Sequence, residues 1–205
     1  MAEAQRFWKS IESRRRAFSP DSAELSPLKR RLIDRIKTAF SGVSCYRELR
    51  VLLGGEAEDD YLSPEAQALL VPLEERSDWQ NIPDDLLFAC SCALSYVGPH
   101  AYRFLIPRFL VGALQGVVEI YPGSGPSADP EISTRNQMLY LDEAQRNCLS
   151  DYLNLVSVEE EESECRRGGY LPWEHDEYRE LYATEMDYRD YGRMLIRRYR
   201  EREGI

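Results

Sequence analysis

Histidine is the scarcest chemically versatile side chain in this sequence, since only His100 and His175 occur in 205 residues. Two histidines exclude a His-rich metal site. The five cysteines are odd in number and follow no framework spacing, which is typical of reduced thiols in a reducing compartment. On a helix, Cys90 and Cys92 would point about 200° apart and would not share an ion. We therefore expect no metal, no cofactor and buried structural cysteines.

Long apolar segments are missing as well. No apolar run reaches the roughly 20 residues of a membrane span, because Arg103 and Arg108 interrupt the best candidate. Residues 1–16 have no apolar centre of the kind that defines a signal peptide. These observations predict a cytoplasmic protein with no membrane partner.

The sequence also contains no complete catalytic or nucleotide-binding motif. Gly123-Ser124-Gly125 lacks the full G-x-S-x-G pattern and the flanking strand of a serine nucleophile elbow. Gly54-Gly55 is not followed by the Lys-Ser/Thr pair of a phosphate-binding loop. The sequence therefore favours a protein that is not an enzyme.

Negative charge dominates, with a formal net charge of −10, and it is unevenly distributed. Residues 1–37 carry ten Lys or Arg against five Asp or Glu, whereas residues 38–164 carry seven against 22. Residues 165–205 carry nine of each sign. Nucleic-acid binding requires cations that face phosphates, so the acidic body argues against a nucleic-acid partner.

The richest apolar block lies between Trp79 and Tyr121 and contains almost no charge. It locates the core. Around it, helical periodicity prevails and no hairpin signal is found. Helices are predicted over residues 3–17 and from Ser26-Pro27 to Gly42, where serine is the N-cap and proline the first helical residue.

Further helix boundaries follow from glycine, proline and serine. We expect a helix from Ser44 to Leu53 that Gly54-Gly55 ends, an acidic loop at 56–60 and a short helix after Ser63. Pro83 and Pro99 each begin a helix, the first of which Gly98 ends. Pro107 should restart the chain as a separate helix as far as Tyr121, with a strand near Val117 as a minor alternative.

The last third of the chain is predicted to alternate loops with helices. Residues 122–130 form a loop, and Asp142 caps a helix that ends near Ser157. The predicted fold is therefore all-α: a single compact multi-helix domain with an N-terminal helical extension and a long C-terminal helix. The segments expected are the extension (1–25), the helical core domain (26–157), an acidic and glycine-containing linker (158–169) and the amphipathic C-terminal helix (170–205).

Several short patterns resemble an uncharacterised bacterial family, a domain of unknown function. They are Ile36-Lys37-Thr38-Ala39-Phe40-Ser41-Gly42, Trp79 with Ile82-Pro83, the stretch from Leu94 to Pro107 (LSYVGPHAYRFLIP), and Leu141-Asp142-Glu143-Ala144-Gln145. The resemblance covers about residues 30–157. It implies a helical cytosolic bacterial domain and says nothing about chemistry.

The candidate small-molecule site lies in the apolar block. His100, at a helix start beside Arg103, is a candidate general base, although a surface or capping bond is the commoner use of such a histidine. Arg103 and Arg108 are either rim residues or buried cations with an acidic partner, for which Asp84 and Asp85 are candidates. At the mouth of a pocket, either arginine would bind an anion.

A candidate protein-binding surface lies near the C-terminus, where tyrosine and tryptophan alternate with arginine. These residue types dominate interface hot spots, although packing on the body explains the tyrosines equally well. The residues expected to bind a partner are Trp173, Tyr178, Tyr182, Arg189, Arg193 and Tyr199. His175 stands among carboxylates at a helix start, where neighbouring residues cannot all face one ion.

The leading functional hypothesis is a non-enzymatic protein-binding role, namely an acidic inhibitor of the immunity type that neutralises a bacterial toxin. The acidic runs at 56–60 and 159–164 would imitate nucleic acid toward a basic nuclease, unless they are merely solvated loops. One alternative is an enzyme of unknown reaction with a site near His100 and Arg103. Another is a structural protein that self-associates, as a homo-oligomer, through its C-terminal helix.

Overall fold

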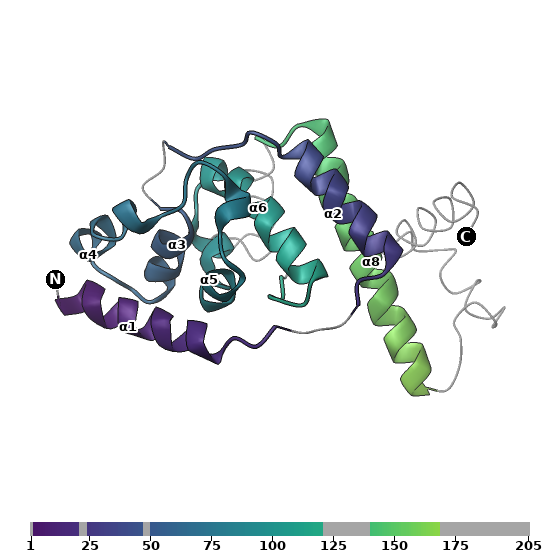
Figure 1. Cartoon of the computed structure of the whole chain (residues 1–205), viewed down its shortest axis with the longest axis horizontal. Coiled ribbons are helices and arrows are strands. Elements are labelled where there is room, and N and C mark those ends of the chain that lie inside the picture. Colours follow the sequence, from purple (N-terminus) through teal and green to yellow (C-terminus); the bar gives the residue numbers. More distant parts are fainter. Residues whose placement is uncertain (1, 21–23, 47–49, 121–139, 169–205) are drawn as a thin grey trace, which may run out of the picture. The chain divides into compact units, whose positions relative to one another are not determined.

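The computed structural model describes residues 2–20, 24–46, 50–120 and 140–168. Within these ranges the chain forms α-helices and short 3₁₀ helices and no strand, so the all-α class is confirmed (Figure 1). The elements are α1 (Ala2–Ala17), α2 (Pro27–Ala39), α3 (Leu52–Asp59), α4 (Pro64–Ala68), η1 (Val71–Leu73), η2 (Trp79–Asn81), α5 (Asp84–Ala89), η3 (Ala93–Tyr96), α6 (Pro99–Leu114) and α8 (Glu143–Gly168).

The chain divides into two compact units, Met1–Arg146 and Asn147–Ile205. The first unit contains α1 to α6 and the beginning of α8. The predicted C-terminal helix over 170–205 lies outside the described residues, and the division at 25, 157 and 169 stays a prediction. None of the helices in the described part of the chain is long and apolar enough to cross a membrane.

The predicted helix starts at serine are confirmed where a proline follows. Ser26 accepts a hydrogen bond from the Lys29 backbone N–H at 3.2 Å, and Ser63 caps α4 in the same way. Each serine satisfies a backbone donor that the first turn would otherwise leave unpaired. Gly42, which follows α2, has a φ of +73°, as expected for a glycine that ends a helix.

The core lies where the apolar block predicts it. Trp79 is 2% exposed, and its indole N–H donates to the Phe40 carbonyl at 3.0 Å, which fastens η2 to the end of α2. Helix α6 is buried along most of its length, including Phe104, Leu105 and Phe109. The apolar block therefore forms the centre of the first unit.

The predicted helix from Ser44 to Leu53 is wrong for residues 44–46 and 50–51, and the predicted loop at 56–60 is helical as far as Asp59. Helix α3 begins at Leu52, contains Gly54-Gly55 and continues through the acidic run to Asp59. The glycines allow a close approach to η3, because a Cβ on Gly55 would lie 2.7 Å from the Ala93 carbonyl oxygen. Here glycine marks close packing of two backbones and not the end of a helix.

Glu74 satisfies the N-terminus of α3. Its carboxylate accepts hydrogen bonds from the backbone N–H groups of Val51, Leu53 and Gly54 at 3.1, 3.1 and 2.8 Å. Burial raises the pKa of Glu74, although these three donors lower it in part. A side chain about 20 residues away thus does what an N-cap residue usually does.

We expect Glu74→Gln to lower the free energy of unfolding by about 1–2 kcal/mol, because the amide nitrogen cannot accept from a backbone N–H and the charge at the helix N-terminus is lost. Urea unfolding measures this change. The matched control is Glu65→Gln on the exposed first turn of α4, which should change stability by less than about 0.5 kcal/mol. Equal effects of the two substitutions would contradict the cap.

Further helix boundaries also differ from the prediction. Helix α5 ends at Ala89 and only the short η3 follows, because the backbone N–H of Cys92 donates to Glu56 at 3.1 Å instead of continuing a helix. Helix α6 runs through Pro107 without the predicted restart. Burial of this helix outweighs the roughly 3 kcal/mol that an internal proline costs.

Gly116 explains why α6 ends before Tyr121. It has a φ of +75°, and the next residue, Val117, donates from its backbone N–H to the Gly112 carbonyl at 2.7 Å. This is the Schellman arrangement that closes many helices. Residues 117–120 belong to no strand, so the minor alternative is also wrong.

Helix α8 begins where Asp142 predicts it. The Gln145 backbone N–H donates to the Asp142 carboxylate at 2.9 Å, and the Asp142 N–H donates to the Gln145 side chain at 3.2 Å, which is a capping box. The helix then continues to Gly168, beyond the predicted end at Ser157. The acidic run at 159–164 lies within this helix, as the high helix propensity of glutamate allows.

Candidate functional site

The most unusual charged group in the described structure is Glu56, which lies on the buried face of α3. The residue is 1% exposed, and its carboxylate accepts hydrogen bonds from the Arg14 guanidinium and from the Cys92 backbone N–H. Burial raises the pKa of Glu56, and the bond with Arg14 opposes that rise. A buried carboxylate of this kind requires a cation, and here helix α1 supplies it.

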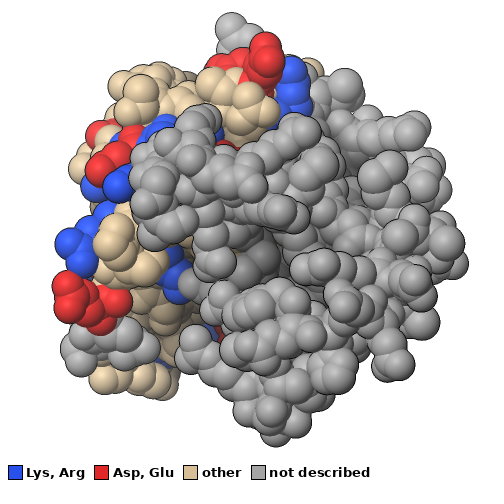
Figure 2. Space-filling model, turned by 90° about the vertical axis from the view of Figure 1, so that its right-hand side faces the viewer, with Lys and Arg blue, Asp and Glu red and all other residues tan. Residues whose placement is uncertain are grey.

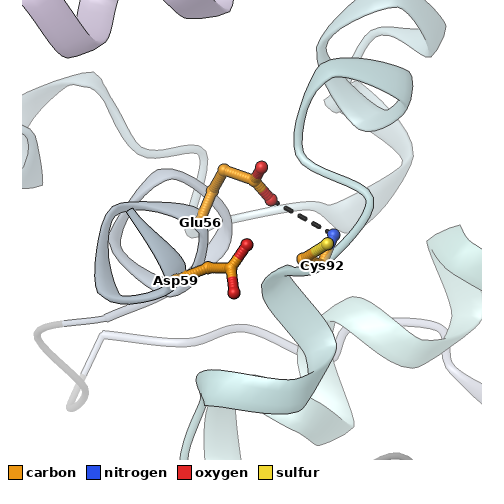
Figure 3. Close-up of side chains that lie close together, drawn as sticks. All are labelled: Glu56, Asp59 and Cys92. Carbon is orange, nitrogen blue, oxygen red and sulfur yellow. Dashed lines mark hydrogen bonds between the residues drawn. The ribbon is translucent and has the colours of Figure 1, made fainter. Parts of the chain in front are cut away.

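Asp59 and Cys92 lie beside Glu56 and complete a small cluster of possible metal ligands (Figure 3). One ligand atom of each residue lies within 4.8 Å of the others. Two carboxylates and a thiolate are a donor set that Zn²⁺ accepts. Burial and the carboxylates of Glu56 and Asp59 raise the pKa of the Cys92 thiol, which disfavours the thiolate. In this structure the Glu56 carboxylate of the cluster pairs with the Arg14 guanidinium.

The negative potential of this cluster extends to its neighbours. A hydrogen bond with Asp59, together with the charge of that carboxylate, raises the pKa of Tyr96 to about 12. Burial, with Glu56 and Glu74 nearby, raises the pKa of Cys90 well above its usual range. Cys90 is thus a buried structural cysteine, as predicted, whereas Cys92 is exposed. The raised pKa values keep Tyr96 and Cys90 protonated at neutral pH.

Helix α1 is attached to the rest of the first unit by polar contacts near both of its ends. Near the C-terminal end, Arg14 also bonds Asp60 at 3.1 Å, and Arg15 bonds Asp85 at 2.9 Å. Near the N-terminal end, the Glu3 carboxylate accepts from the backbone N–H and the hydroxyl of Ser63 at 2.8 and 2.7 Å. These contacts join α1 to four residues elsewhere in the first unit, which we call the α1 seat: Glu56, Asp60, Ser63 and Asp85.

The structure places the two predicted arginines of α6 in different surroundings. Arg108 is 7% exposed and bonds the Asp84 carboxylate and, at 2.8 Å, the Ile82 carbonyl. Arg108 is therefore a buried cation with one of its two predicted acidic partners. Asp85, the other predicted partner, pairs with Arg15.

Arg103 belongs to a separate structural network. Its guanidinium donates to Gln145 at 3.1 Å, and Gln145 donates in turn to the Ala39 carbonyl at 3.0 Å. His100 is exposed, and its ring lies 4.4 Å from that of Tyr140. The structure thus does not bring Arg103 and Arg108 to a common anion, and the enzyme interpretation stays a prediction. The expected partner-binding residues between Trp173 and Tyr199 lie outside the described residues.

Sequence reasoning missed Arg14, Glu56 and Glu74 as functional or structural charges. Glu56 stood within an acidic run, which usually forms a solvated surface. One signal pointed the other way, because Leu52-Leu53-Gly54-Gly55 and Ala57 make Glu56 the first charge in an otherwise apolar or small segment.

On the face seen in Figure 2, basic and acidic side chains lie next to each other over the described part of the surface.

These observations define an all-α protein whose described charges mostly stabilise the fold. The chain belongs to a family of unknown function, DUF6714, whose sequence model matches residues 28–167. This confirms the resemblance to an uncharacterised domain, while the bacterial origin stays a prediction. No curated protein and no solved structure matches the chain. Helix α1 lies outside the matched residues.

Proposed function

We propose that this protein is a non-enzymatic protein-binding protein, an acidic inhibitor of the immunity type that neutralises a toxin in the bacterial cytoplasm. The observation that carries the proposal is Tyr61, which is 93% exposed and follows Asp59 and Asp60 at the end of α3. Tyrosine beside carboxylates is the composition expected of a contact surface for a basic protein.

The backbone of Tyr61 makes this interpretation stronger. Its φ is +56°, the only positive value among the described residues other than glycine. The left-handed region costs a residue with a side chain about 1 kcal/mol, and an exposed ring offers little packing in return. Backbone bonds hold the turn, because the Tyr61 and Leu62 N–H groups donate to Glu58 and Ala57 at 3.1 and 2.9 Å. The ring is therefore presented from a fixed backbone.

The charges of the fold support binding in preference to catalysis. Three charged side chains bind groups of the fold itself. Arg108 donates to a backbone carbonyl, Arg103 donates to a side-chain amide, and Glu74 accepts from the N-terminus of a helix. Glu56 is neutralised by Arg14. In this structure each of these groups has a partner within the fold, whereas catalytic groups need access to a substrate. The acidic body would attract a basic toxin such as a nuclease, the class that gains most from charge complementarity.

Tyr61→Gly tests the proposal without damaging the fold. Glycine adopts a positive φ at little cost, so the variant should unfold at the same free energy or up to about 1 kcal/mol higher. When a tagged chain is purified from its native host, the wild type should retain a stoichiometric protein partner. The variant should retain at least about tenfold less, because hot-spot tyrosines contribute about 2 kcal/mol.

The control is Tyr46→Ala, which removes another exposed tyrosine, 69% exposed, and should leave the partner bound. The proposal is wrong if the wild type retains no stoichiometric partner and its neighbouring genes encode no toxin. It is also wrong in its choice of surface if the two variants lose the partner equally.

A further inference from the structure

We infer that the surface beneath α1 is a groove for a basic amphipathic helix of the protein partner, and that α1 is the chain's own occupant of that groove. The inference deepens the proposed function, on which it rests, by naming the part of the partner that binds. It assigns to α1 an autoinhibitory role, since the partner helix must replace it.

The apolar side chains of α1 are buried in the way expected for a helix that binds in a groove. Ala4, Phe7 and Ile11 recur at helical spacing and are 8%, 3% and 0% exposed. Helix α1 lies along α5 and α4 within the first unit (Figure 1). Beyond the helix, the ring of Phe18 packs against that of Phe88, with 5.5 Å between the ring centroids. A groove that takes three apolar residues at i, i+3 and i+7 is a common mode of helix recognition.

Polar contacts fix the direction and the register of the occupant. Glu3 and Arg14 are separated by about 16 Å along the helix, at 1.5 Å per residue. One bonds Ser63 and the other bonds Glu56 and Asp60. The segment from Asp60 to Ser63 therefore runs beside α1, and Tyr61 lies within it. A partner helix in the α1 seat would come close to the tyrosine that carries the proposed function.

Charge determines the class of helix that fits. Helix α1 carries five Lys or Arg and two Glu, and three arginines occupy its last turn. The seat opposes two of them, Arg14 and Arg15, with Glu56, Asp60 and Asp85. The seat lies within residues 28–167, the part of the chain that matches the family, whereas α1 precedes it. The seat thus belongs to the family domain, and a basic helix of similar pattern from another protein satisfies the same contacts.

The experiment uses the full chain with α1 weakened at its apolar contacts. In the variant Phe7→Asp/Ile11→Asp, α1 should leave the groove while the rest of the chain stays folded. The probe is a fluorescent peptide with the sequence of residues 1–18, and fluorescence anisotropy measures its binding. The variant should bind it at least tenfold more tightly than the wild type, where the resident helix competes at an effective concentration of about millimolar.

Two altered peptides establish which features are recognised. A peptide with Arg14→Glu/Arg15→Glu should bind at least tenfold more weakly, because it meets carboxylates in the seat. A peptide with the apolar residues moved by one position should also bind at least tenfold more weakly, because it no longer has the required face. Raising the salt concentration should weaken binding of the natural sequence.

Circular dichroism and thermal unfolding show that each chain is folded. If Phe7→Asp/Ile11→Asp unfolds, Arg14→Glu/Arg15→Glu in the full chain replaces it, since this pair weakens α1 without exposing new apolar surface. The inference is overturned if a folded variant binds the α1 peptide no better than the shifted peptide. It is also overturned if both variants unfold, because α1 would then be an integral part of the core.

The results separate this inference from the proposed function. If the peptide does not bind but Tyr61→Gly abolishes co-purification of a partner, the protein binds its partner without using the groove. If the peptide binds but the wild type co-purifies with nothing, the groove exists and the proposed function is wrong.

Discussion

Gly55→Ala is expected to lower the free energy of unfolding by about 2–3 kcal/mol, although alanine is the better helix former. A Cβ at this position would lie 2.7 Å from the Ala93 carbonyl oxygen and 2.9 Å from a methyl group of Val97. Both distances are shorter than folded proteins tolerate, and a backbone oxygen cannot rotate away. The resulting separation of α3 from η3 is an overpacking effect, which outweighs the gain of about 1 kcal/mol in helix propensity.

The neighbouring glycine provides the matched control. A Cβ on Gly54 would lie 3.2 Å from Arg50 Cβ and 3.3 Å from Glu74 Oε1, distances that a shift of a few tenths of an ångström would relieve. Gly54→Ala should therefore change stability by less than about 1 kcal/mol in either direction. Urea unfolding of the two variants gives the comparison. If Gly55→Ala were as stable as the wild type, α3 would not pack against η3 as described.

Arg14→Ala should lower the free energy of unfolding by about 2–3 kcal/mol at pH 8. Removing the cation leaves the Glu56 carboxylate buried without its counterion, and breaking a buried pair typically costs about 3–5 kcal/mol. The loss is smaller here because the Arg14 side chain is 34% exposed, so water can enter, and because the Cys92 N–H remains. Arg16→Ala, with an 81% exposed side chain, should cost less than about 0.5 kcal/mol.

The penalty of Arg14→Ala should depend on pH. The pKa of Glu56 in the folded protein lies above its ordinary value of 4.5, and without Arg14 it should lie higher still. A carboxyl group with a raised folded pKa binds a proton more readily folded than unfolded. Stability of the variant therefore recovers as pH falls through that raised pKa, until the unfolded chain is also protonated below about 4.5.

Urea unfolding at pH 8 and at pH 5 measures this dependence. The difference between wild type and Arg14→Ala should be smaller at pH 5. A difference that does not change with pH would show that Arg14 stabilises α1 without its bond to Glu56.

The parts of the fold that could be predicted are those that local chemistry decides. Ser26-Pro27 and Ser63-Pro64 are helix starts because the serine hydroxyl and the proline ring act within one turn of the backbone. The core around Trp79 was predictable because a long apolar segment is stabilised by burial away from water. The capping box at Asp142 and Gln145 belongs to the same group of short-range features.

The misjudged parts depend on distant contacts. Gly55 favours a helix end in isolation, and only its packing against Ala93 explains why the helix continues. Pro107 is tolerated because α6 is buried on most sides. Glu56 is a buried ion-pair partner because α1 places Arg14 beside it, 42 residues away in the sequence. Periodicity within α3 does not contain that information.

The candidate site was predicted only in part. The pairing of Arg108 with Asp84 was anticipated as a structural alternative, and the structure contains it. The sequence does not predict the α1 seat, because a short basic helix and an acidic run are typical of an extension and a solvated loop. Membership of a family of unknown function adds the limits of the matched region, residues 28–167. It says nothing about the chemistry of the residues within it.

Native mass spectrometry of the tagged wild-type chain, purified from its native host at low ionic strength, tests the central claim most directly. The protein-binding account predicts a one-to-one complex heavier than the 23.8 kDa chain, with a basic partner that is released as salt is raised. Detection of only the 23.8 kDa chain, or of its own multiples, would contradict the account.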